Sequence, residues 1–243
     1  MQRSTTQRLR LAGGLAAMVL LAGAAAAPAG ASPAPPVRAT QPVAVLNHDT
    51  EAFTKPSRSS GSAGELNEVR PITGERTVLP VVAETTDTQG ALWLDVLLPG
   101  RPNSHTGWIE ASIVTLTVTD WQVFVHLSTR QVVIYSGGHV VRTFLAVVGK
   151  PSTPTPTGHF FVEETVPLGP QGSGAPFALA LSARSNALTE FDGGPGQVAL
   201  HGIANIGGTP GTAVSHGCVR LDTADTTWLE DLISSGVPVT ITP

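Results

Sequence analysis

Short apolar segments separated by glycine and proline run through most of this 243-residue sequence, which contains 26 Gly and 20 Pro, and they constrain its fold more than any other feature. Between residues 43 and 114 no segment has the apolar spacing of a helix. Further on, Trp121, Val123, Val125 and Leu127 occupy alternate positions, which is typical of a half-buried strand. Turn-forming residues bound each segment, so we predict strands at residues 43–46, 77–83, 91–98, 107–114, 121–127, 131–136, 140–149, 159–165, 177–182, 197–201 and 237–241.

A single helix is predicted near the C-terminus. Asp222 can cap its first turn, and Asp225 places a negative charge at the same end. Gly236 can end the helix. The apolar face that follows the cap consists of Trp228, Leu229, Leu232 and Ile233. The chain is therefore expected to be all-β with one C-terminal helix.

The first 31 residues have the order of a signal peptide. Three arginines and no acid precede an apolar segment at residues 11–27, and Ala29-Gly30-Ala31 is typical of a cleavage site. An uncleaved membrane anchor is the alternative, although seventeen residues diluted by Ala and Gly are short for a bilayer core of about 30 Å. We therefore expect an exported protein of the cell wall or medium whose mature chain begins near Ser32.

The composition of the remaining chain predicts three parts. Residues 32–42 are rich in Pro and Ala and are predicted to form an extended linker. The short strands at residues 43–116 predict a small barrel-like module, and those at residues 119–243 predict a second β domain. With 18 Asp and Glu against 14 Lys and Arg, and no basic cluster, the chain is not expected to bind nucleic acid.

Three segments of the first module resemble the SH3-like modules of bacterial wall proteins. They are Trp93-Leu94-Asp95-Val96, Arg101-Pro102-Asn103 and Thr106-Gly107-Trp108-Ile109. The alternative is that Trp93 and Trp108 are ordinary core aromatics.

Cys218 is the only cysteine, so an exported form of the chain cannot contain an internal disulfide. It follows Gly217 in a polar segment rather than an apolar one, which favours a reactive thiol over an inert buried one. A thiol is mostly protonated at neutral pH and needs a base, and His201, at the end of a predicted strand, can be held rigidly toward it. His216, two residues from the thiol on the same predicted loop, is the other candidate base.

His201-Gly202, together with the segment GTAVSHGCVRL at residues 211–221, resembles the active-site signature of the L,D-transpeptidase family. The resemblance extends over about residues 119–243 and includes the turn Thr155-Pro156-Thr157-Gly158. It implies a β-sandwich catalytic domain with a Cys218 nucleophile, a His201 base, no cofactor and no metal. It also implies that the enzyme releases D-Ala from a peptidoglycan stem tetrapeptide and joins the third residues of two stems, and that carbapenem-type inhibitors acylate it.

The backbone around the thiol is expected to support this chemistry. The N–H groups of Gly217 and Cys218 can stabilise an oxyanion, because glycine permits close approach of a substrate. The carbonyl of Gly202 can orient the His201 imidazole, since no acid follows at a suitable spacing.

The remaining polar residues of the signature have two interpretations each. Arg220 can grip a substrate carboxylate or form a structural salt bridge. Ser215 can bind substrate or close a turn, and His216 can shape the loop if it is not the base. A glycine-rich loop at residues 183–196 is expected at the mouth of the site, with Phe191 as its one aromatic residue.

Three other functions remain open at this point. His201, His216 and Cys218 are metal-ligand types, although His-x-Cys with one distant His is an unusual zinc spacing. Water can resolve an acyl-enzyme, which would make the protein an L,D-carboxypeptidase or hydrolase of the same stems. A non-catalytic wall-binding protein is the third, but it would have no use for the Cys218–His201 pair.

Overall fold

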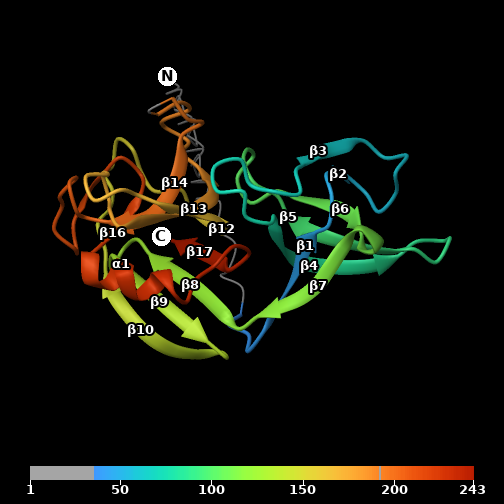
Figure 1. The fold of residues 1–243 in the computed structure, drawn as a ribbon, viewed down its shortest axis with the longest axis horizontal. Helices are drawn as coiled ribbons and strands as arrows, with labels where there is room; N and C mark the ends of the chain where they lie inside the picture. Colours follow the sequence, from blue (N-terminus) through green and yellow to red (C-terminus); the bar gives the residue numbers. More distant parts are fainter. Residues whose placement is uncertain (1–35, 192) are drawn as a thin grey trace, which may run out of the picture. The chain divides into compact units, whose positions relative to one another are not determined.

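The computed structural model describes residues 36–191 and 193–243, which belong to one compact unit. Strands dominate these residues, and the only α-helix among them lies near the C-terminus (Figure 1). The predicted class is therefore confirmed as a mostly β protein with one short C-terminal helix. The predicted signal peptide at residues 1–31 and the first part of the predicted linker lie outside the described residues.

Seven antiparallel strands form the first sheet. They are β1 (Gln41–Leu46), β2 (Thr50–Phe53), β3 (Ser62–Leu66), β4 (Val78–Thr86), β5 (Leu92–Leu97), β6 (Thr106–Glu110) and β7 (Val114–Thr119), with a 3-10 turn, η1, at Ala111–Ile113. Their order is β3-β2-β6-β5-β4-β1-β7 (Figure 1). Leu46, Leu79, Leu94 and Ile109 are fully buried in its apolar core.

The strands of this module differ from the sequence-based prediction, since β2, β3 and most of β7 lie outside the predicted segments. Strands β2 and β3 occur where no strand is predicted; β3 contains Ala63 and Gly64, which have low strand propensity, and pairing with β2 holds it. Strand β1 begins inside the predicted linker, and its whole length pairs with β7. Trp93 is only 2% exposed and donates its Nε1–H to Asp87 at 3.0 Å, as a core aromatic would. The SH3-like resemblance stays a prediction.

Eight strands form the second sheet, in the order β10-β9-β8-β17-β12-β13-β14-β16. The two short strands β11 and β15 pair separately. The bounds are β8 (Trp121–His126), β9 (Gln131–Ser136), β10 (His139–Leu145), β11 (Val148–Gly149), β12 (Gly158–Pro167), β13 (Phe177–Arg184), β14 (Gln197–Gly202), β15 (Ala213–Ser215), β16 (Val219–Leu221) and β17 (Pro238–Thr242).

Strand β12 joins two halves of the second sheet. Its first residues, Gly158–Phe161, pair with β17, and its later ones, Val162–Pro167, pair with β13. Side chains from both halves pack into one apolar core, around which the sheet curls into a nearly closed barrel (Figure 1). The two halves of the expected β-sandwich are thus parts of one continuous sheet, and both halves pair with β12.

The helix α1 (Thr223–Glu230) begins where the sequence predicts it. Asp222 accepts the Ala224 N–H at 3.0 Å, and Leu229 packs into the core of the second sheet. It ends six residues before Gly236, and the Leu232 N–H then donates to the Leu229 carbonyl in a tighter i→i−3 turn. No helix among residues 36–191 and 193–243 is long and apolar enough to cross a membrane.

Adjacent residues of β12 belong to the cores of different sheets. Phe160 packs into the core of the second sheet, whereas Phe161 packs into the core of the first. Successive side chains of a strand point to opposite faces, so one strand can serve both cores. Two residues further on, Glu163 forms ion pairs with Arg70 of the first module and, at 2.9 Å, with Arg184 of β13. The two modules are therefore packed together rather than joined only by the chain.

Candidate active site

Two parallel strands place the predicted nucleophile and base on one face of the second sheet. In the register of β14 and β16, Leu200 lies opposite Val219 and His201 lies opposite Arg220. Leu200 and Val219 point into the core. Because side chains alternate, His201, Arg220 and Cys218, the residue just before β16, share the opposite face. The sequence-based pairing of Cys218 with His201 is thus supported by strand register.

The His201 ring is held in one orientation. It is 7% exposed, and its Nδ1 lies 2.8 Å from the carbonyl oxygen of Gly202. A carbonyl can only accept, so Nδ1 donates its proton and Nε2 keeps the free lone pair. Burial lowers the pKa of His201, an effect that this hydrogen bond opposes and the nearby Arg220 charge reinforces. The imidazole is therefore neutral at pH 7, with the nitrogen needed for a base available.

Gly174 packs against the His201 ring, a role that the sequence-based analysis missed. A Cβ at Gly174 would overlap the His201 Nδ1. The backbone here is also left-handed, with φ +89°, and Gly174 accepts the Gly202 N–H at 2.9 Å. A glycine in a loop before a strand does not by itself indicate a functional role in the sequence. Only the folded structure brings Gly174 to the His201 imidazole.

The loop that carries Cys218 is fixed by its neighbours. Ser215 is fully buried; its Oγ accepts the Gly217 N–H at 3.1 Å and donates to the Cys218 carbonyl at 2.6 Å. The Thr155 hydroxyl donates to the Gly217 carbonyl at 2.8 Å. Gly217 itself has φ +124°, which a residue with a side chain rarely adopts. Ser215 therefore closes the turn, and its hydroxyl is engaged in doing so.

Burial is the largest influence on the pKa of the Cys218 thiol. Burial raises the pKa of Cys218, and a backbone hydrogen bond from Ala199 and the charge of Arg220 only partly oppose this. The hydrogen bonds among residues 36–191 and 193–243 do not include one between Cys218 and His201. Burial therefore favours the uncharged thiol of Cys218 and the uncharged imidazole of His201.

Arg220 is buried without a carboxylate partner. It is 6% exposed, its Nη1 donates to the Gly207 carbonyl at 3.1 Å, and its backbone pairs with Val147. None of the ion pairs between described residues involves it, so the expected salt bridge is not formed. Its charge instead lowers the pKa of both Cys218 and His201, which favours thiolate over thiol and imidazole over imidazolium.

The His216 ring contacts Phe191 and Lys150 and lines the same cavity as Cys218. It is exposed, stacks on Phe191 with ring centroids 5.9 Å apart, and places Nε2 3.4 Å from the Lys150 Nζ. A cavity of about 30 Å³ opens beside Cys218, as expected at the loop of residues 183–196. It is lined by Ser185, Leu188, Phe191, Gly196, Gln197, Val198, His216 and Cys218. The part of the chain that the structure describes gathers no group of three or more metal-ligating side chains.

Comparisons with known proteins point to one family. The family model of the L,D-transpeptidase catalytic domain, YkuD, matches residues 120–241, half of the chain. The candidate L,D-transpeptidase YkuD of Bacillus licheniformis is 28% identical over 73% of this chain and 99% of its own length. L,D-transpeptidase 1 of Mycobacterium tuberculosis is 30% identical over 47% of each chain. A solved E. faecium catalytic domain acylated by ertapenem is 24% identical, with 51% of this chain and 98% of that chain covered and a TM-score of 0.37.

The chain belongs to the L,D-transpeptidase family of cysteine transpeptidases, whose catalytic domain cross-links peptidoglycan. The predicted family and enzyme class are confirmed. Because the family acts on the cell wall, its site of action lies outside the cytoplasm.

Proposed function

We propose that Cys218 forms a thioester with the third residue of a peptidoglycan stem tetrapeptide. The thiol proton passes to His201 Nε2 as sulfur attacks the carbonyl carbon, and His201 then gives this proton to the departing amine of D-Ala. The side-chain amine of a second stem's third residue attacks the thioester, His201 takes its proton, and the sulfur leaves to regain it. The product is an amide between the third residues of two stems.

The observation that carries this proposal is the fixed tautomer of His201. Its Nδ1–H is committed to the Gly202 carbonyl, which leaves Nε2 as the only ring atom able to accept a proton. His201 shares its strand face with Cys218, whereas the His216 ring is engaged with Phe191 and Lys150. These contacts favour His201 as the base and His216 as a residue that shapes the loop.

The oxyanion is assigned to the backbone beside the nucleophile. The Gly217 N–H already donates to Ser215 Oγ, so we assign the main donor role to the Cys218 N–H. Gly217 contributes the left-handed turn that directs it. The charge of Arg220 stabilises the thiolate of Cys218, and its guanidinium holds the Gly207 carbonyl. Recognition of a substrate carboxylate is a second role that we propose for Arg220.

Product analysis tests the reaction and separates its alternatives. The mature protein is incubated with a stem tetrapeptide, with and without a stem that supplies only the acceptor amine. A transpeptidase gives a cross-linked product of the two stems minus D-Ala, and a hydrolase gives free tripeptide in both samples. Absence of any D-Ala release by a folded protein would leave the wall-binding alternative. Carbapenem-type compounds should acylate the same thiol, as ertapenem acylates the E. faecium relative.

The export route is part of the proposal. The basic start, apolar segment and Ala29-Gly30-Ala31 of the sequence support cleavage near Ser32. N-terminal sequencing of the protein from the wall or medium fraction should begin within a few residues of Ser32. Recovery of the intact Met1 in the membrane fraction would instead establish the uncleaved anchor.

A further inference from the structure

A loop of the first module reaches the wall of the thiol's cavity. Residues 98–105 connect β5 and β6, and Arg101 lies at their centre. Its Nη1 donates to the Pro195 carbonyl at 2.9 Å, and its Nη2 donates to the carbonyls of Ser185 at 2.6 Å and Leu188 at 3.4 Å. A single guanidinium thus ties together both ends of the loop that follows β13.

The same loop forms one side of the cavity beside Cys218. Ser185, Leu188 and Gly196 line that cavity. Arg101 bonds the carbonyls of Ser185 and Leu188 directly, and Gly196 follows Pro195, whose carbonyl Arg101 also bonds. The packing is close, since a Cβ at Gly196 would overlap the Leu188 carbonyl and lie 3.3 Å from the Arg101 Nη2. The position of this wall therefore depends on a residue outside the catalytic domain.

The Arg101 segment is itself fastened to the second sheet. Asn103 both accepts the Arg184 N–H at 2.8 Å and donates to the Arg184 carbonyl at 2.7 Å. Ser104 Oγ accepts the His159 N–H at 2.9 Å, and the Gly100 N–H donates to the Ser182 carbonyl at 3.2 Å. These bonds fix the base of the segment, so the guanidinium is presented at a defined place. A planar fork of donors suits three separate carbonyls better than a single ammonium would.

We propose that Arg101 is a positioning residue for the acylation of Cys218. It holds the wall formed by residues 185–191 and 193–196, so that an acyl donor is aligned with the thiol, and it makes the first module part of the catalytic machinery. The identity of the acyl donor in this inference rests on the proposed function. The coupling between Arg101 and the cavity wall is independent of the proposed function.

Two electrophiles of different size provide the test. A carbapenem needs a shaped site to align its carbonyl with Cys218, whereas iodoacetamide is small and alkylates the thiol without such alignment. Arg101→Ala should slow carbapenem acylation about 10- to 100-fold, because displacement of a positioning group by about 1 Å has an effect of that size. Its iodoacetamide rate should stay within about twofold of wild type or rise, so the ratio of the two rates changes. Arg101→Lys, which can reach one carbonyl but not three, should give an intermediate ratio.

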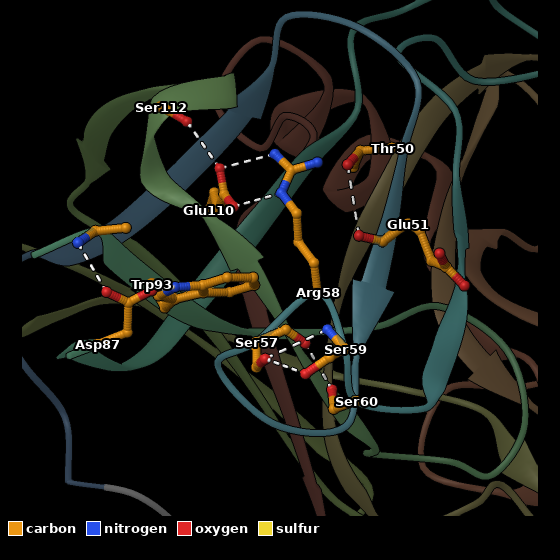
Figure 2. Close-up of polar contacts among 11 residues, drawn as sticks. Thr50, Glu51, Ser57, Arg58, Ser59, Ser60, Asp87, Trp93, Glu110 and Ser112 are labelled. Carbon is orange, nitrogen blue, oxygen red and sulfur yellow. Dashed lines mark hydrogen bonds and ion pairs between the residues drawn. The ribbon is translucent and has the colours of Figure 1, made fainter. Parts of the chain in front are cut away.

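Hydrogen exchange supplies a readout that does not depend on any substrate. Peptides from residues 185–196 should exchange faster in Arg101→Ala, while those from β14 should not change. Arg58→Ala is the matched control: it removes the same charge from the same module, where Arg58 pairs with Glu110 at 2.6 Å (Figure 2). This control should match wild type in both measurements.

The outcomes separate the two proposals. Wild-type exchange and a wild-type rate ratio in Arg101→Ala would overturn the positioning role, as would equal changes in Arg58→Ala. If the carbapenem fails to acylate even the wild-type protein, the proposed function fails. The exchange of residues 185–196 and the iodoacetamide rates would still decide the role of Arg101.

Discussion

Single atoms decide which histidine can act at this site. The bond from His201 Nδ1 to the Gly202 carbonyl sets the tautomer, and burial keeps the ring neutral. Burial also favours the uncharged thiol, because it raises the pKa of Cys218. In the mechanism that we propose, the two groups exchange a proton during attack, and the charge of Arg220, which lowers the pKa of Cys218, favours that step.

The lowered pKa of His201 affects how the rate of acylation depends on pH. The base works only when deprotonated, and a lowered pKa keeps His201 deprotonated to more acidic pH than an ordinary histidine. The acid limb of the acylation rate should therefore have its midpoint below the ordinary value of 6.5. The check is the second-order rate constant of carbapenem acylation from about pH 4.5 to 8; a midpoint above about 7 would contradict the assignment.

A substitution at Gly174 acts directly on the His201 imidazole. Gly174→Ala should slow acylation about 10²- to 10⁴-fold, because the new methyl group displaces the His201 ring from its hydrogen bond. Gly90→Ala is the control, since Gly90 has nearly the same φ, +87° against +89°, but open space around it. Both variants should lose about 1–2 kcal/mol of folding stability from left-handed backbone strain. Equal acylation rates in the two would refute the role of Gly174.

At the scale of elements, the sequence predicts the strands that alternate clearly and misses those that depend on partners. The strand predicted at residues 121–127 corresponds to β8, which ends at His126, and Asp222 caps α1, because periodicity and capping are local signals. Strands β2 and β3 are specified by pairing with each other, and a tight turn from Leu229 to Leu232 follows the early end of α1. The motif likewise points to Cys218 and His201 as the candidate nucleophile and base, whereas only tertiary contacts bring Gly174 to His201 and Arg101 to the wall of the cavity beside Cys218.

Strand β12 should behave as a shared structural element. Phe161→Ala should lower the free energy of unfolding by about 3–5 kcal/mol, because the ring is 1% exposed and lies in the core of the first sheet. Leu116→Ala on β7, where the side chain is 48% exposed, should change it by less than about 0.5 kcal/mol. Urea unfolding followed by circular dichroism measures both; equal small effects would mean that β12 does not serve the first core.

At the scale of the molecule, the two modules share a buried charge cluster. Glu163 has no exposed side-chain surface and lies between Arg70 and Arg184. Burial lowers the pKa of Arg184 to about 10, so it remains charged at neutral pH. The sequence predicts two parts, a small barrel-like module at residues 43–116 and a second β domain at residues 119–243. Because the two share Phe161 and Glu163, we expect that a chain starting at residue 117 is destabilised.

Removal of one cation from this cluster tests the coupling. Arg70→Met should cost about 3–5 kcal/mol, because it leaves Glu163 buried with a single partner. Arg58→Met, which breaks the exposed pair with Glu110, should cost no more than about 1 kcal/mol. Calorimetry should show one transition in the wild type, shifted down as a whole in Arg70→Met. Two transitions, of which only one moves, would show that the modules unfold independently.

The central claim, that Cys218 is acylated with His201 as its base, is tested most directly by intact-mass kinetics with a carbapenem. The wild-type protein should gain the mass of one inhibitor, and Cys218→Ala should gain none. His201→Gln should react about 10²- to 10⁴-fold more slowly, whereas His216→Gln should stay within about tenfold of wild type. An adduct on Cys218→Ala, or a larger loss in His216→Gln than in His201→Gln with both folded by circular dichroism, would contradict the account.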